Sequence, residues 1–320
     1  MKKNLFNFLL GGAFLLSAPM LTSCEDILGE WDRPTPVTPS GGGSSGATGT
    51  YIVYTAPGTS SSVAIPSTAT AWNFTTGNVP AGTYYVEGSF TSTGALVLQG
   101  EVNLILKDGA TLTVDNGIGS AVDGSYNFIA SLNVYAQSTD PSTMGQLIVN
   151  NASGGDEPTA VVLKSLTIHG GQISATGDTN NTGTNGSYGI ETGTGKVIIY
   201  DGIISATGKK GVPGIGTWGI GGGIDIYGGT VTATGGDGTA TVNGGAGINS
   251  NECILTVNGG EVIATGGATG GAGAGKGVDY SSGGISLGTG ITLYQGDAPN
   301  PTDVVSTTPI ACTKRYVEIR

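Results

Sequence analysis

Four stretches of the chain repeat one pattern and decide the fold: LTIHGGQISATG at 166–177, VIIYDGIISATG at 197–208, IDIYGGTVTATG at 224–235 and LTVNGGEVIATG at 255–266. Within each copy apolar and polar residues alternate, which is the period of a strand with one buried face. In the first copy Leu166 and Ile168 point inward, a Gly-Gly corner follows, and Ile173 and Ala175 point inward again. Each copy therefore predicts strands that bend at a glycine corner.

A short apolar insert precedes each main strand and adds a third short strand to the unit. The inserts are Gly189-Ile190, Gly214-Ile215, Gly247-Ile248 and Gly284-Ile285. One unit cannot bury its inner face alone, but stacked units with parallel pairing at about 4.8 Å bury a continuous column. We expect one buried stack made of Ile168, Ile199, Ile226 and Val257.

The sequence therefore predicts an all-β chain folded as a parallel β-helix, right-handed by the general rule for parallel crossovers. A propeller would need antiparallel blades of about 40–45 residues, longer than these repeats. A single domain is expected over 50–320, with irregular coils at 50–165, clear repeats at 166–297 and a cap at 298–320. The repeats include a decayed fifth copy, ITLYQGD at 291–297, and the cap ends in a charged strand with Lys314, Arg315 and Arg320.

The composition supports a turn-rich β protein. Glycine accounts for 60 of 320 residues, charged residues for 11% and hydrophobic residues for 38%. Glycine at this level disfavours helical bundles, and the hydrophobic share disfavours a disordered chain. The net charge of −11 argues against nucleic acid as a partner.

The first 23 residues have the pattern of a secretory signal, with Lys2 and Lys3 before an apolar stretch at 5–16. The sequence Leu-Thr-Ser-Cys at 21–24 resembles the lipobox of bacterial lipoproteins, which implies that Cys24 carries the lipid. Residues 24–49 are rich in Pro, Gly and Ser and are expected to form a tether. The acids after Cys24 are similar to the surface-export signal of Bacteroidetes lipoproteins. That likeness implies a lipid anchor in the outer membrane, with the protein facing the cell exterior.

The phrases NLILKDGATLTV at 103–114 and LNVYAQS at 132–138, together with the GGxVxATGG repeat, resemble a family of bacterial surface β-helix proteins. These proteins are often labelled carbohydrate-binding-domain or adhesin-like repeat proteins. The resemblance covers roughly 101–296 and implies a polysaccharide-associated role at the cell surface. Polysaccharide lyases share this fold. The resemblance therefore also suggests family members that bind pectin or cellulose in a calcium-dependent way.

Aromatic residues are the main candidates for glycan binding. The residue before each corner is outward by parity, so stacked coils would place these side chains in one surface column: Tyr135, His169, Tyr200, Tyr227, Asn258 and Tyr294. Aromatic faces suit sugars, although tyrosine ladders also stabilise sheets without any ligand. The loops between repeats add three further candidates, Tyr188, Trp218 and Tyr280.

Catalysis is not expected from these residues. His169 is the single histidine, no arginine occurs between 51 and 309, and the acids are scattered singly. Asp178 and Asp237 begin loops after the ATG step and are candidates for binding Ca²⁺, with solvated turn residues as the alternative. Cys253 is in phase with inward positions and predicts a buried free thiol, and the sequence does not decide whether it pairs with Cys312.

We therefore expect a surface lipoprotein that binds polysaccharide without catalysis. Two alternatives stay open at this point. One is a structural adhesin that contacts a protein partner, and the other is a degenerate polysaccharide lyase or hydrolase.

Overall fold

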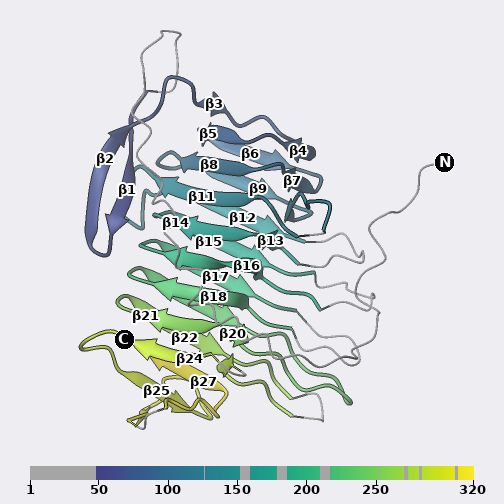
Figure 1. Ribbon diagram of the computed structural model, residues 1–320, viewed down its shortest axis with the longest axis vertical. Coiled ribbons are helices and arrows are strands. Elements are labelled where there is room, and N and C mark those ends of the chain that lie inside the picture. The colour runs from purple at the N-terminus through teal and green to yellow at the C-terminus, as the bar shows by residue number, and fades with distance from the viewer. Residues whose placement is uncertain are drawn as a thin grey trace, which may run out of the picture.

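The computed structural model describes residues 48–125, 127–151, 159–178, 186–209, 217–251, 253–269, 273–280, 283–306 and 309–320. Over these ranges the regular structure is strand, with no helix. The strands stack in chain order along the long axis and form a curled parallel arrangement (Figure 1). The all-β, parallel character predicted from the repeats is confirmed.

Most strands belong to two sheets. The larger sheet contains β3 (Thr70–Ala71), β4 (Gly77–Val79), β5 (Gly82–Val86), β7 (Leu96–Leu98), β8 (Glu101–Leu106), β10 (Ile118–Ser120), β11 (Ser131–Ala136), β13 (Val161–Leu163), β14 (Ser165–Ile168), β16 (Ile190–Ile199), β18 (Ile220–Ile226), β20 (Ile248–Asn251), β21 (Ile254–Val257), β23 (Val278–Tyr280) and β24 (Gly284–Leu287). The second sheet contains β6 (Ser89–Ser92), β9 (Thr111–Val114), β12 (Gln146–Asn150), β15 (Gln172–Thr176), β17 (Ile203–Thr207), β19 (Thr230–Thr234), β22 (Glu261–Thr265), β25 (Leu293–Gly296), β26 (Asp303–Val304) and β27 (Tyr316–Ile319).

Equivalent residues of successive repeats pair directly. Ile168 pairs with Ile199, Ile199 with Ile226, and Ile226 with Val257. All four side chains are fully buried, which confirms the predicted stack. A side chain placed above its own equivalent fills the same space in each repeat, so the pattern of the sequence fixes the register.

The glycine corner has a steric cause. Gly202 has φ +113°, and a Cβ added there would lie 2.7 Å from the carbonyl oxygen of Gly171 in the repeat before. Any other residue would meet both an unfavourable backbone angle and the neighbouring backbone. The corner therefore needs glycine because successive turns of chain approach each other closely there.

The repeat register differs from the prediction in two places. Ile190 pairs with Ile220, so the insert of the second unit is Gly219-Ile220 and not Gly214-Ile215. The fifth copy is β24, whose Ile285 pairs with Leu255, and not the segment ITLYQGD. Gly284-Ile285 therefore belongs to the main strand, and the insert of that unit is Gly277-Val278, where Val278 pairs with Ile248. Tyr294 instead lies in β25, which runs antiparallel to β27, so the predicted position of Tyr294 is wrong.

The charged final strand covers the last parallel strand of the second sheet, but it lies between β22 and β25, so the edge of that sheet is β26 and not β27. β27 pairs antiparallel with β22, and Arg315 donates its Nε–H to the carbonyl oxygen of Gly266 at 2.8 Å. Pairing of this kind occupies backbone groups that an open edge would leave free.

The first described strands do not form a coil, contrary to the prediction for 50–165. β1 (Thr50–Ala56) and β2 (Thr59–Ala64) pair antiparallel as a separate two-stranded sheet. This hairpin stands beside the stack of parallel strands and packs against the outer side of the larger sheet (Figure 1). Its position decides which outward residues of that sheet reach solvent.

Candidate functional site

The predicted aromatic column exists over four repeats. The ring centroids of Tyr135 and His169 are 4.6 Å apart, those of His169 and Tyr200 are 5.1 Å apart, and those of Tyr200 and Tyr227 are 5.3 Å apart. All three pairs are stacked nearly parallel. Because each ring covers the face of the next, the column offers ring edges outward and keeps its faces inside the stack.

The hairpin covers the first part of this column. Tyr51 packs edge-on against Tyr135 at 5.0 Å, and Tyr54 stacks beside Tyr200 at 6.0 Å. As a result Tyr135 is only 6% exposed and His169 only 2% exposed. The expectation that both are surface residues is wrong, because parity decides which side of a strand a residue takes but not what covers that side.

The rest of the column is more open but offers little area. Tyr200 and Tyr227 are half-buried, and Asn258, the next position, is exposed. Tyr294 lies outside the column and has the guanidinium of Arg320 over its ring at 4.6 Å. A sugar platform made of this column as a whole is therefore not available while the hairpin is docked.

The predicted loop aromatics also pack against the protein. Tyr188 and Trp218 stack with centroids 4.1 Å apart, and burial raises the pKa of Tyr188 well above its usual value. The indole Nε1 of Trp218 is buried and makes no hydrogen bond within the described part of the chain. Tyr280 lies in β23, where its hydroxyl donates to the carbonyl oxygen of Ile310 and its ring packs on the core.

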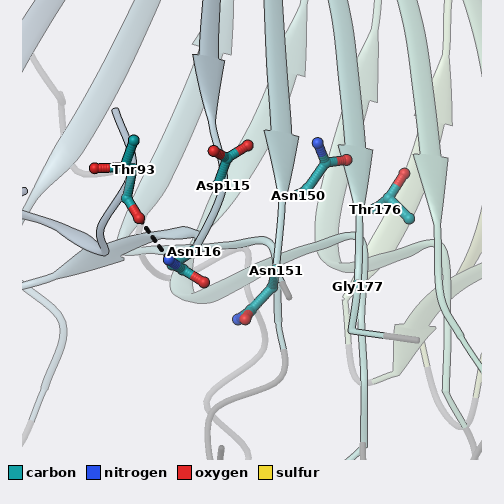
Figure 2. Close-up of a pocket in the computed structure, with 7 residues that line it drawn as sticks. All are labelled: Thr93, Asp115, Asn116, Asn150, Asn151, Thr176 and Gly177. Atoms are coloured by element: carbon teal, nitrogen blue, oxygen red, sulfur yellow. Dashed lines mark hydrogen bonds between the residues drawn. The ribbon is translucent and has the colours of Figure 1, made fainter. Parts of the chain in front are cut away.

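A polar groove lies at the end of the second sheet and was not predicted (Figure 2). It is a hollow of about 570 Å³ at the carboxyl ends of β6, β9, β12 and β15. Its lining consists of Thr93, Asp115, Asn116, Asn150, Asn151, Thr176 and Gly177. All of these except Gly177 carry a polar side chain.

Three lining residues occupy one row across adjacent strands. The pairing of Val149 with Val114 places Asn150 beside Asp115, and Asn150 pairs with Thr176. Figure 2 shows these three side chains next to one another at the strand ends. Adjacent strands are about 4.8 Å apart, so the row presents a carboxylate, an amide and a hydroxyl at regular steps.

The groove residues divide into two groups by their hydrogen bonds. Asn116 donates Nδ2–H to the carbonyl oxygen of Thr93 at 2.7 Å, and Asn151 donates Nδ2–H to that of Thr159 at 2.9 Å. Both amides therefore bind the protein backbone. The side chains of Asp115, Asn150 and Thr176 have no hydrogen-bond partner in the structure as described. These three half-buried groups are therefore available to a ligand.

The row continues along the clear repeats. Thr176 pairs with Thr207, Thr207 with Thr234 and Thr234 with Thr265, so one line of hydrogen-bonding side chains crosses the second sheet. The part of this line formed by threonines corresponds to the ATG steps of the repeats and was visible in the sequence. The first half of the line could have been found by aligning TLTVDN at 111–116 and LIVNN at 147–151 with the SATG pattern.

The predicted calcium residues occupy different environments. Asp178 is buried, and its carbonyl oxygen accepts a hydrogen bond from Ser187 Oγ at 3.0 Å. Asp237 is exposed, and its Oδ1 accepts a hydrogen bond from the backbone N–H of Ala268 at 2.7 Å. Over the described residues, no three His, Cys, Asp or Glu side chains gather where they could hold a metal ion. Calcium binding by these loops stays a prediction.

Neither cysteine of the folded region forms a disulfide in the described chain. Cys312 is buried, and burial raises its pKa to about 12, so its sulfur is held as the thiol. Cys253 is only half-buried, which corrects the predicted buried position. Cys24 and all of the predicted tether up to residue 47 lie outside the described residues.

No family model, curated protein or solved structure matches this chain. No helix among the described residues is long and apolar enough to cross a membrane.

Proposed function

We propose that the protein is a lipid-anchored surface protein whose parallel β-helix binds polysaccharide without catalysis. The anchor rests on Cys24 and its lipobox-like context, and the exterior location rests on the acids that follow it.

The β-helix part of the proposal is supported by the order of strands. The chain alternates between the two parallel sheets, as in β14, β15, β16, β17, β18 and β19. Each time the chain returns to a sheet, its new strand pairs in parallel with the equivalent strand of the preceding repeat. A chain that circles in this way closes a single apolar column between its sheets.

The binding part rests on one observation, the row Asp115, Asn150 and Thr176 with unengaged side chains in a hollow. Sugars carry many hydroxyl groups that both donate and accept hydrogen bonds. A carboxylate, an amide and a hydroxyl at the spacing of parallel strands offer complementary groups over a linear path. The continuation through Thr207, Thr234 and Thr265 supports a polymeric ligand over a monosaccharide.

The non-catalytic part rests on the chemistry of the groove. Glycoside hydrolysis uses a pair of carboxyl groups on either side of the scissile bond. Of the seven residues that line the groove, Asp115 is the one with a carboxyl group. A lone acid without a second acid or a base supports binding and not bond cleavage.

The test is a polysaccharide array probed with the full-length protein in detergent, once with calcium and once with a chelator. On any glycan bound by the parent, the double variant Asp115→Ala, Asn150→Ala should bind about 5- to 150-fold more weakly, because two hydrogen bonds are lost. The matched control is Asn258→Ala, an exposed residue outside the groove, which should bind like the parent.

A second comparison keeps the aromatic alternative open to test. The double variant Tyr188→Ala, Trp218→Ala should leave binding unchanged if the groove is the site. Unchanged binding by the groove variant would contradict the proposal, and loss of binding on chelation would move the site to the loops of Asp178 and Asp237.

A further inference from the structure

The hairpin β1–β2 is attached to the rest of the molecule by side chains. Among the described residues, no hydrogen bond between backbone groups joins either strand to the two parallel sheets. Gln137 donates Nε2–H to the carbonyl oxygen of Thr50 at 3.0 Å, and Tyr54 donates Oη–H to Oδ2 of Asp201 at 2.8 Å. An isolated two-stranded hairpin is marginally stable in water, so its order depends on this docking.

The third attachment is a buried histidine. The backbone N–H of Tyr54 donates to Nδ1 of His169 at 3.0 Å. The other ring nitrogen, Nε2, is buried and has no partner within the described chain. His169 must therefore be neutral, with its proton on Nε2, for the hairpin to dock as it does.

We propose that the hairpin is an acid-released cover of the aromatic column, with His169 as the group that senses the proton. Release would uncover the outward side of Tyr135, His169 and Tyr200 and turn a buried aromatic surface into an exposed one. The proposal does not depend on whether the groove binds polysaccharide.

Protonation acts against docking in two ways. A proton on Nδ1 places an N–H donor against the N–H of Tyr54, so that hydrogen bond is lost. The charged ring would also have to stay buried between Tyr135 and Tyr200. Undocking relieves both effects, because a solvent-exposed imidazolium is hydrated.

The other titratable groups around His169 come from three elements. They are Tyr54 from β1, Tyr135 from β11, and Tyr200 with the adjacent Asp201 from the end of β16. Asp201 holds Tyr54 from outside the stack, and its Oδ1 accepts a hydrogen bond from the backbone N–H of Gly202 at 2.8 Å. A variant must therefore separate the effect of Asp201 from that of His169.

The direction of the effect follows from the two states of His169. Burial lowers its pKa from 6.5 to about 4 in the docked state. The undocked state binds more protons between these values, so docking is strongest above pH 6.5 and weakens as the pH falls. The ratio of docked to undocked hairpin should fall about tenfold per pH unit in this window, and about 30-fold by pH 5.

The experiment is hydrogen exchange of the full chain from pH 7.5 to pH 4.5, with rates corrected for intrinsic exchange. Amides of Thr50–Ala64 should lose protection progressively below pH 6.5, while amides of β14, β16 and β18 keep theirs. The variant His169→Phe keeps a ring in the stack but cannot titrate, so its hairpin should show weaker protection without pH dependence. The variant Tyr54→Phe loses the bond to Asp201 and should keep the pH dependence of the parent.

Three results would overturn the proposal. The first is hairpin protection that does not change between pH 7.5 and pH 4.5. The second is the same pH dependence in His169→Phe as in the parent. The third is loss of protection in β14, β16 and β18 together with the hairpin, which would indicate acid unfolding of the whole domain.

Discussion

Tyr188 and Trp218 come from different repeats, and their rings stack at 4.1 Å with an interplanar angle of 12°. The positions are equivalent in the register, since each lies two residues before a buried isoleucine, Ile190 or Ile220, and these two pair. The indole also lies against β18, where a Cβ added at Gly221 would be 2.0 Å from Nε1 of Trp218. The pair is thus a packed part of the wall and not two free rings.

A double-mutant cycle should measure this stack. Tyr188→Ala and Trp218→Ala should show a coupling of about 0.5–1.5 kcal/mol in urea unfolding, the range for aromatic pairs beyond area burial. Additive changes in the free energy of unfolding would contradict the stack and would indicate that the two rings do not interact.

The buried column should not tolerate a charge. Ile226 is fully buried between Ile199 and Val257, so Ile226→Asp places an unpaired carboxylate in the core. We expect a loss of more than about 3 kcal/mol, seen as early urea unfolding and reduced strand signal in circular dichroism. Thr232→Asp, on the outward side of β19, is the control and should remain folded. Normal stability of Ile226→Asp would mean that the register is different.

Substitutions at two corner glycines should distinguish the cost of a positive φ angle from the cost of a clash with neighbouring backbone. Gly88 has φ +69° with open space around it, so Gly88→Ala should cost about 1–2 kcal/mol from the backbone angle alone. Gly202 has φ +113° and a backbone oxygen 2.7 Å from the position of a Cβ, so Gly202→Ala should cost about 3 kcal/mol or more. Equal melting temperatures for the two variants would show that contact between successive turns is unimportant.

The anchor should depend on one side chain. Cys24→Ala removes the proposed lipid attachment site, so the protein should move from membrane fractions to the soluble fraction. The control is Cys253→Ala, which leaves Cys24 in place and should stay with membranes. Equal detergent partitioning of the Cys24→Ala variant and the parent would contradict the lipoprotein assignment.

The parallel fold was predictable because the repeats are nearly identical. Ile168, Ile199 and Ile226 can share one environment only if their strands pair in parallel and in register. The corner was also predictable, since glycine recurs at Gly171 and Gly202, and at Gly202 a side chain would collide with the backbone of the preceding repeat. These features need only local alternation and the spacing of copies, and both are present in the sequence.

The hairpin was not predictable from the same signals. TYIVYTA at 50–56 alternates like the coil strands that follow it. Its partner His169 lies 115 residues further along the chain than Tyr54, and no local pattern indicates that contact. The sequence consequently predicts surface positions for Tyr135 and His169, although both are buried. The predicted position of Tyr294 is wrong for a similar reason. ITLYQGD resembles a repeat in sequence, although β25 pairs antiparallel with β27.

The groove shows a third kind of limit. Asp115 and Asn150 are single polar residues after short strands, and they become one row only when β9 and β12 are placed side by side. The repeats before 166 have diverged too far for this alignment to be evident. A binding surface built across strands is encoded in the register, and the register is clear only where the copies are similar.

The attachment of the hairpin has a mechanical consequence. With the chain anchored at Cys24 as proposed, a pull on the body reaches β1 and β2 before it reaches any parallel strand. The hairpin is held by ring contacts and a few side-chain hydrogen bonds, whereas the parallel strands are tied by ladders that would have to break together. Under tension the hairpin should detach first and lengthen the tether, acting as an extensible element that spares the parallel sheets from load.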